Sequence, residues 1–113
     1  MTAAEEIAMR LEGKVAISVG AGQSPGEGIG NGRATAIRFA QEGAKILAVD
    51  RDIESAKETA TLATKEGAEC IAFEADVTNE VTLAEAVDFA RRRWGRIDIL
   101  HNNSWSTKPP RRR

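Results

Sequence analysis

The sequence contains no tyrosine and only one cysteine, and aromatic residues make up 4% of its 113 residues. A lone cysteine, Cys70, excludes an intramolecular disulfide and a cysteine-based metal cluster, which fits a reducing compartment. No apolar run approaches the roughly 20 residues that span a membrane. The N-terminus also lacks the basic start and apolar stretch of a secretory signal. We therefore expect a cytoplasmic protein with no membrane partner and no metal site.

An excess of charge of one sign is also lacking, because 16 Lys and Arg residues are balanced by 17 Asp and Glu residues. The net charge of -1 provides no basic field for nucleic acid or for an anionic membrane surface. Three arginines at positions 111 to 113 are the local exception, and we interpret them as a solvated end of the chain. The composition thus predicts no nucleic-acid partner.

Short apolar runs alternate with helix-like segments along the chain. The runs that read as strands are residues 15–19, 45–49, 70–75 and 97–101. The helices between them are expected over residues 33–42, over 53–66 after the N-cap Asp52, and from a cap at Thr78 or Asn79 to Gly95. Helical crossovers of this length return each strand in the same direction. The pattern predicts an α/β fold with a doubly wound parallel sheet.

A glycine-rich turn follows the first predicted strand, with six glycines in the thirteen residues 20–32. Glycine there permits a positive φ, close approach of the main chain to a phosphate, and tight packing of helix on strand. The next helix offers free N–H groups and a positive dipole end to an anion. A P-loop is excluded, because the turn has no Gly-Lys-Ser/Thr ending. We therefore predict that this turn binds the pyrophosphate of a dinucleotide.

An acidic residue stands where a dinucleotide site needs one. Asp50 ends the second predicted strand, 18 residues after Gly32 (50 − 32) and 20 after Gly30 (50 − 30). A carboxylate at this spacing accepts hydrogen bonds from the adenosine ribose and repels a 2'-phosphate, which favours NAD over NADP. Arg51 beside it could neutralise such a phosphate, so NADP ranks second. The alternative is a solvated strand-end acid, but strand, turn, helix, strand and acid in this order favour the cofactor site.

Several separate motifs resemble the N-terminal half of a short-chain dehydrogenase/reductase, a family of NAD(P)-dependent oxidoreductases with a Rossmann-type fold. They are "LEGKVAISVGAG", "GRATAIRFAQEGAKILAVDRD", "FEADVTNE" and "WGRIDILHNN", and they span Leu11 to Asn103. The resemblance implies hydride transfer between a nicotinamide cofactor and an alcohol or carbonyl substrate.

The resemblance implies cofactor-binding roles for residues of the turn. Gly20, Gly30 and Gly32 match the family's three turn glycines, with Asn31 between the last two. The register of the following helix selects Gly32 as the last of them, and Gly22 is left unassigned.

Cofactor roles are also implied at the later strand ends. Asp50, with Arg51 beside it, matches the ribose-binding acid, and Asp76 and Val77 match the pair that meets the adenine ring. Asn103, after Asn102, matches the start of a motif near the cofactor ribose. The alternatives are a helix-capping acid at Asp76 and a strand-end turn at the asparagines.

Two features depart from the family pattern. Nine residues separate Gly20 from Gly30 where the family has three, which indicates an inserted loop. Asn103 is followed by Ser104 and Trp105 where the family has Ala-Gly. The family's catalytic Ser and Tyr-x-x-x-Lys, in which Tyr is the general acid/base, have no match in a chain without Tyr. We expect no catalytic residue here, and we interpret the chain as a truncated dehydrogenase product that is inactive alone.

The expected organisation is one partial dinucleotide-binding domain, residues 1–103, followed by a divergent, extended tail, residues 104–113. The family's strand order, 3-2-1-4-5-6-7, would place the fourth strand at an open edge of the sheet here. Unpaired N–H and C=O groups on such an edge favour association. A second hypothesis is therefore a non-catalytic nucleotide-binding or regulatory fragment that pairs with itself or with a full-length homologue through that edge.

Overall fold

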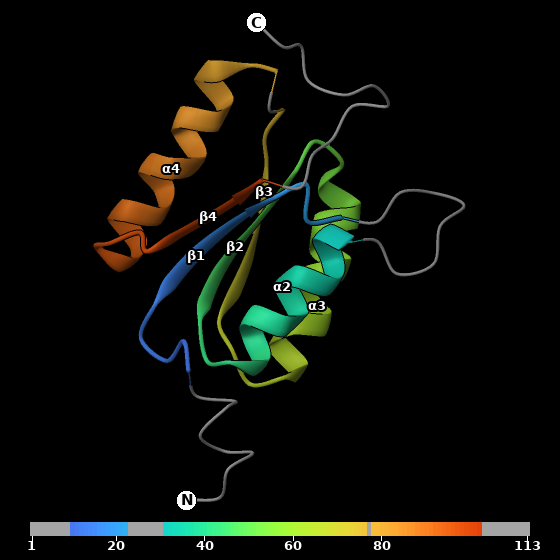
Figure 1. Ribbon diagram of the computed structural model, residues 1–113. Coiled ribbons are helices and arrows are strands. Elements are labelled where there is room, and N and C mark those ends of the chain that lie inside the picture. Colours follow the sequence, from blue (N-terminus) through green and yellow to red (C-terminus); the bar gives the residue numbers. More distant parts are fainter. Residues whose placement is uncertain (1–9, 23–30, 77, 103–113) are drawn as a thin grey trace, which may run out of the picture.

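The computed structural model describes residues 10–22, 31–76 and 78–102. Within them, parallel strands form one sheet that carries helices α2 and α3 on one face and α4 on the other (Figure 1). The elements are β1 Val15–Val19, α2 Asn31–Gln41, β2 Lys45–Asp50, α3 Ile53–Lys65, β3 Cys70–Glu74, α4 Glu80–Trp94 and β4 Ile99–Asn102. The strand order is β3-β2-β1-β4, so β3 and β4 form the two edges. The predicted α/β parallel sheet is confirmed.

The central strands β1 and β2 form the middle of the core. All five residues of β1 are buried, and so are the four residues 46–49 of β2. Ile17 and Leu47 pack toward α4, whereas Ile46 packs against the small side chains of α2 and α3. Strands covered on both faces read as continuous apolar runs, which is why "VAISV" and "KILAV" were recognisable as strands.

The helix ends follow the capping residues in the sequence. Asp52 is the N-cap of α3, and its side chain accepts the N–H groups of Glu54 and Ser55. Asn79 rather than Thr78 caps α4, and Gly95 ends that helix in the left-handed conformation at φ 81°. Side chains at these positions satisfy N–H groups that no helical carbonyl can reach. These caps fix where α3 and α4 begin relative to the strands before them.

Some element boundaries differ from expectation. Strand β4 begins at Ile99 instead of residue 97. Before it, the Asp98 N–H donates to the carbonyl of Val15 at 2.9 Å, but the Val15 N–H donates to the side-chain Oδ2 of Asp98 at 2.9 Å instead of to a strand carbonyl. Ile97 packs on the α4 side of the core instead. The expected domain boundary at 103/104 lies outside the described residues. In the described part of the chain, no helix is both long enough and apolar enough to cross a membrane.

Candidate functional site

The carboxyl ends of all four parallel strands lie at the same end of the sheet, and this end is called the carboxyl edge below, to distinguish it from the edge strands β3 and β4. In the parallel register, Val19 of β1 lies between Val49 of β2 and Asn102 of β4, and Asp50 lies beside Glu74 of β3. The segments that follow these strands therefore meet at a single edge, where ligands bind in open parallel sheets. This edge contains the predicted site residues that the structure describes.

The turn after β1 bends over the end of β2. Gly20 has φ 76°, a conformation that glycine adopts without strain. The N–H groups of Gly20 and Ala21 both donate to the carbonyl of Val49, at 2.8 and 3.0 Å. The positive φ and these two bonds turn the chain from β1 toward Asp50.

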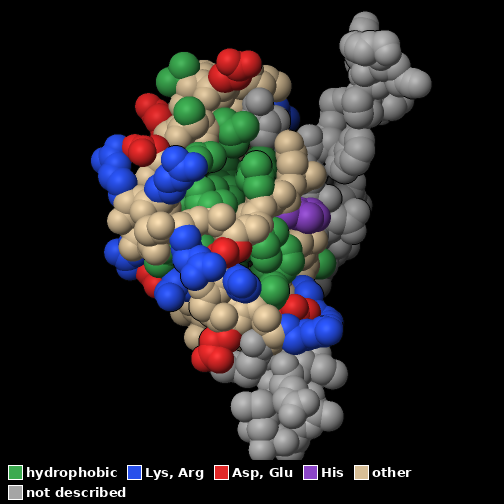
Figure 2. Space-filling model, turned by 60° about the vertical axis from the view of Figure 1, so that its left-hand side comes forward, with side chains coloured by type: hydrophobic (Ala, Val, Ile, Leu, Met, Phe, Trp, Pro, Cys, Tyr) green, Lys and Arg blue, Asp and Glu red, His purple; other side chains and the backbone are tan. Residues whose placement is uncertain are grey.

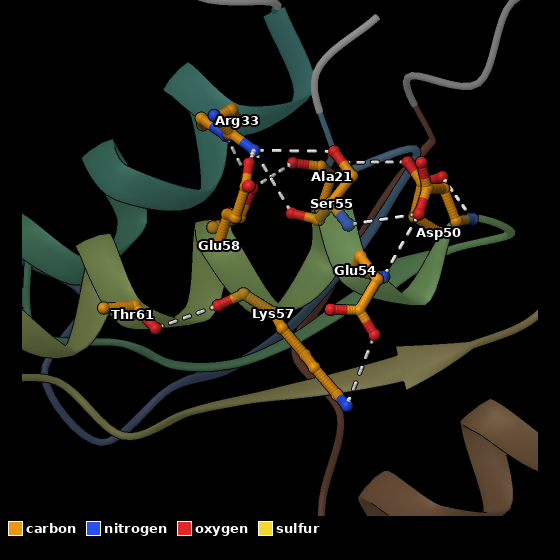
Figure 3. Close-up of polar contacts among 11 residues, drawn as sticks. Ala21, Arg33, Asp50, Glu54, Ser55, Lys57, Glu58 and Thr61 are labelled. Carbon is orange, nitrogen blue, oxygen red and sulfur yellow. Dashed lines mark hydrogen bonds and ion pairs between the residues drawn. The ribbon is translucent and has the colours of Figure 1, made fainter.

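Asp50 is fixed at the end of β2 by backbone donors on both of its oxygens. The N–H of Gly22 donates to Oδ2 at 2.8 Å, and the N–H of Asp52 donates to Oδ1 at 2.9 Å (Figure 3). Because a carboxylate offers about four acceptor positions, these two bonds leave Asp50 with further acceptor capacity. The carboxylate is therefore held in place by the backbone and can still accept hydrogen bonds.

Gly22 is the site residue that the sequence left unassigned. A Cβ at this position would lie 2.4 Å from Oγ of Ser55 and 2.8 Å from Oδ2 of Asp50, so any other residue would displace these side chains. Its N–H contact to a carboxylate 28 residues later connects the glycine turn to Asp50. The only signal in the sequence was the glycine itself, because glycine allows close contacts that a Cβ would block. The letters "GAG" alone do not show which of the two glycines makes such a contact.

Gly32 allows the start of α2 to lie against the turn. A Cβ at this position would be 1.7 Å from the carbonyl oxygen of Gly20, so the two backbone segments touch. Asn31, the first residue of α2, directly precedes this contact. Gly30 lies outside the described residues. Gly20 and Gly32, which were predicted to act together, are thus in direct contact, and the N-terminus of α2 lies at the turn.

Arg33 forms a buried polar network that the sequence did not reveal. Its Nε donates to Oγ1 of Thr59 at 2.9 Å, and that hydroxyl donates in turn to the carbonyl of Ala21 at 2.8 Å. Its Nη2 contacts the carbonyl of Ser55 at 3.2 Å and a carboxylate oxygen of Glu58 at 3.0 Å (Figure 3). The i, i+3, i+4 spacing of these three α3 residues puts them on one helix face, which is the only trace of the network in the sequence.

Asp76 follows β3 and shapes the loop that leads to α4. Its Oδ1 accepts the N–H of Thr78 at 2.9 Å and the hydroxyl of Thr78 at 2.7 Å. These bonds to Thr78, with a smaller contribution from the charge of Arg51, lower the pKa of the Asp76 carboxyl. The helix-capping alternative for Asp76 is not observed, because Asn79 is the N-cap of α4. Val77 and Asn103, the other two predicted contacts, lie outside the described residues.

His101 and Cys70 do not form a catalytic centre. His101 packs edge-on against Phe39, with ring centroids 6.1 Å apart, and its buried Nδ1 has no hydrogen-bond partner within the described ranges. Burial raises the pKa of the Cys70 thiol to about 12, so this side chain stays protonated at neutral pH. A general base needs a partner that orients it, and a nucleophilic cysteine needs a lowered pKa. Both residues therefore pack the fold.

The arrangement of the edge combines a glycine turn, a helix N-terminus and a fixed carboxylate in the order that dinucleotide-binding folds use. A sequence profile of the short chain dehydrogenase family matches residues 14–109. The chain belongs to the short-chain dehydrogenase family. This match confirms the resemblance seen in the motifs and the Rossmann-type character of the sheet.

Curated short-chain dehydrogenases are similar to this chain over part of their length. The 7alpha-hydroxysteroid dehydrogenase of Escherichia coli K12 is 35% identical over 101 residues, which are 89% of this chain and 37% of the relative. The levodione reductase of Leifsonia aquatica is 38% identical over 106 residues, 92% of this chain and 38% of the relative. The chain thus spans less than two fifths of the length of these relatives.

Solved short-chain dehydrogenase structures share the fold. One from Burkholderia xenovorans superimposes with a TM-score of 0.80 at 44% identity and covers 89% of this chain and 40% of its own. Carveol dehydrogenase from Mycobacterium avium, solved in complex with NAD, gives a TM-score of 0.76 at 32% identity over 90% of this chain and 39% of its own. The four-stranded sheet is therefore a part of the larger family fold.

Proposed function

We propose that this chain binds a nicotinamide adenine dinucleotide at the carboxyl edge of its sheet and prefers NAD to NADP. The observation that carries the proposal is the Asp50 carboxylate, fixed by the N–H groups of Gly22 and Asp52 beside the Gly20 turn. Two charged oxygens held at the ribose position accept both hydroxyls of NAD and repel the 2'-phosphate of NADP. Asp76, ionised next to this edge, borders the adenine end of the site.

In the proposed site, the residues have separate roles. The N-terminus of α2, with Gly30, Asn31 and Gly32, binds the pyrophosphate, because its free N–H groups and the helix dipole favour an anion. Gly20 lets the main chain of the turn lie close to that anion. Asp50 orients the adenosine ribose, with Arg51 at its side.

The adenine and nicotinamide ends of the cofactor meet the later strand ends. Asp76 and Val77 contact the adenine ring, and Asn103 lies near the cofactor ribose. When bound, the cofactor supplies the hydride acceptor of an oxidoreductase.

We further propose that these 113 residues do not transfer hydride by themselves. They contain no tyrosine, and neither His101 nor Cys70 has the surroundings of an acid/base or nucleophile. The parental reaction, oxidation of an alcohol or reduction of a carbonyl compound, is thus supported by family membership rather than by residues of this chain. We also propose a cytoplasmic location. It is supported by the single cysteine, which is free, since proteins of oxidising compartments usually carry disulfides.

Calorimetric titration of the purified chain tests the cofactor preference. We expect NAD to bind more tightly than NADP, and Asp50→Ala to weaken NAD by about tenfold or more, since hydrogen bonds to a charged group contribute roughly 1.5–3 kcal/mol. The loss for NADP is smaller, because the substitution also removes a repulsion. Asp50→Asn, which retains an amide oxygen for the turn, checks that the fold survives, and Asp88→Asn on α4 is the control. Equal losses of affinity for NAD and NADP would mean that Asp50 does not contact the ribose.

A second candidate function is association through β4. This strand pairs with β1 on one side and with no other described strand on the other, and Leu100 is 61% exposed. An open edge next to an exposed apolar side chain favours pairing with a second copy or with a full-length homologue. Analytical ultracentrifugation discriminates the two proposals: a monomer that binds NAD supports the first alone, and an NAD-insensitive oligomer supports the second alone.

A further inference from the structure

The buried side chain of Arg33 connects three segments that meet at the carboxyl edge. It begins on the first turn of α2, directly after the Gly32 contact with Gly20, and only 8% of the residue is exposed. A guanidinium is seldom buried to this degree unless its donors are satisfied. The partners that satisfy it therefore show what the residue is for.

The strongest of these connections passes through Thr59. The hydroxyl of this fully buried residue accepts from Nε of Arg33 and donates to the carbonyl of Ala21, so both of its hydrogen-bonding roles are used. The relay joins the first turn of α2 to the turn after β1 by way of α3. It fixes the distance between the turn and the N-terminus of α2, whose N–H groups are proposed to bind the pyrophosphate.

A second connection reaches the ribose acid through Ser55. Nη2 of Arg33 contacts both the carbonyl and the Oγ of Ser55, at 3.2 and 3.4 Å. The Oγ of Ser55 lies so close to Gly22 that a Cβ there would be 2.4 Å away. Gly22 in turn donates its N–H to Asp50. The same guanidinium thus supports the backbone that orients the carboxylate.

We propose that Arg33 is a positioning residue for the dinucleotide: it holds the N-terminus of α2 against the Ala21–Gly22 turn, so that the N–H groups of the first turn of α2 bind the pyrophosphate beside that turn. The inference rests on the proposed function, because it needs a dinucleotide at this edge. The donors of Arg33 named above are directed at α3, so the residue acts on the ligand through the backbone and not by direct contact. Arg33 donates hydrogen bonds from Nε and Nη2 in one plane to different α3 residues, and a lysine ammonium does not supply this geometry.

A positioning role and a purely stabilising role for Arg33 predict different effects on ligand affinity: only a positioning role affects ligands with a pyrophosphate more than ligands without one. Removing the relay displaces the N-terminus of α2 relative to the turn, which weakens ligands that carry a pyrophosphate. Adenosine contacts Asp50, whose other oxygen is held by the Asp52 N–H without Arg33, so its affinity falls less. A residue that merely stabilised α2 on α3 would lower the melting temperature without separating these ligands.

The test is an NMR titration of the 12.2 kDa chain with NAD, ADP and adenosine. We expect Arg33→Met and Thr59→Val to raise the dissociation constants for NAD and ADP by about tenfold, and that for adenosine by less than about threefold. Thr59→Ser, which retains the hydroxyl, restores wild-type affinity, whereas Arg33→Lys does not. The matched controls are Arg38→Met, an exposed arginine of α2, and Thr61→Val, an exposed threonine of α3, and neither changes binding.

The outcomes separate this inference from the function on which it rests. Wild-type chain that binds no NAD would overturn both. Wild-type binding with unchanged affinity in Arg33→Met and Thr59→Val, or with equal losses for adenosine and ADP, would overturn the positioning role alone. If Arg33→Met does not fold, the comparison of Thr59→Val with Thr59→Ser decides the question, since Val replaces the hydroxyl of Thr59 by a methyl group of similar size and Ser retains the hydroxyl.

Discussion

The two faces of the sheet are held together by different kinds of interaction. On the α4 face, large apolar side chains of β1 and β2 pack against α4, with Ile17 and Leu47 fully buried. On the α2–α3 face, small alanines let the helices come close, and the Arg33 network lies between them at the carboxyl edge. Apolar burial is strong but non-directional, whereas hydrogen bonds fix geometry. The α4 face thus rests on apolar burial, and the α2–α3 face adds directed polar contacts next to the site.

The α4 face also leaves apolar surface uncovered. Leu100 lies beside Ile17 in the register of β4 on β1, so it faces the α4 side, where it is 61% exposed. Figure 2, in which the left-hand side of Figure 1 comes forward, shows a group of hydrophobic side chains in green in the middle of this view. The site residues on the opposite face, by contrast, are supported by contacts within the described part of the chain.

The largest expected effect comes from breaking the close approach of α2 to the turn. In Gly32→Ala the new Cβ would overlap the carbonyl of Gly20, so the backbone must move, and we expect a loss of about 4 kcal/mol or more in unfolding free energy. Gly67→Ala is the control, because no atom lies within 4 Å of its Cβ position and only its φ of +96° opposes the change. That costs roughly 1–2 kcal/mol. Urea unfolding of both variants gives the comparison, and similar losses would refute the contact.

A smaller pair of effects compares covered and uncovered leucines on the α4 face. Leu47→Ala removes a fully buried side chain and is expected to cost about 2–5 kcal/mol in unfolding free energy. Leu100→Ala removes an exposed one and is expected to cost less than about 0.5 kcal/mol. Thermal and urea unfolding measure both. A large loss for Leu100→Ala in a monomeric sample would mean that β4 is covered in solution.

The smallest effect is the pH dependence at the junction of β1 and β4. The hydrogen bond from Arg96 first, then the Val15 N–H, lower the pKa of the Asp98 carboxyl below its usual value of 3.8. Since the folded pKa is the lower one, Asp98 stabilises the fold above about pH 4 and loses this contribution as the pH falls through the folded value. Asp98→Asn should therefore lower the melting temperature near pH 7 and have less effect near pH 3. A constant difference across this range would contradict the depressed pKa.

The fold was predictable because local signals agree with one another. The apolar runs of β1 and β2, the caps Asp52 and Asn79, and the terminating Gly95 each indicated the element that forms. The boundary of β4 was not predictable, because the Asp98 contact with Val15 joins residues 83 positions apart. Local patterns do not contain such a contact.

The convergence of the predicted residues at one end of the sheet was predictable, but the contacts among them were not. Asp50 and Gly20 were identified by their spacing from the strands, and the structure brings both to one edge. The roles of Gly22 and Arg33 depend on α3, since Ser55 and Thr59 contact the turn only after β2 and α3 have folded over it. An arginine in the first turn of a helix reads as a solvated residue until its long-range partners are known.

Mapping NAD onto the folded chain by NMR tests the central claim most directly. The account predicts that the amide signals of Gly20, Gly22 and Asp52 move on titration with NAD, because their N–H groups lie in the turn and on the Asp50 carboxylate. The signals of Asp88 and Arg92, on the exposed side of α4, stay in place. Unmoved turn amides, or shifts that concentrate on α4, would contradict a dinucleotide site at the carboxyl edge of the sheet.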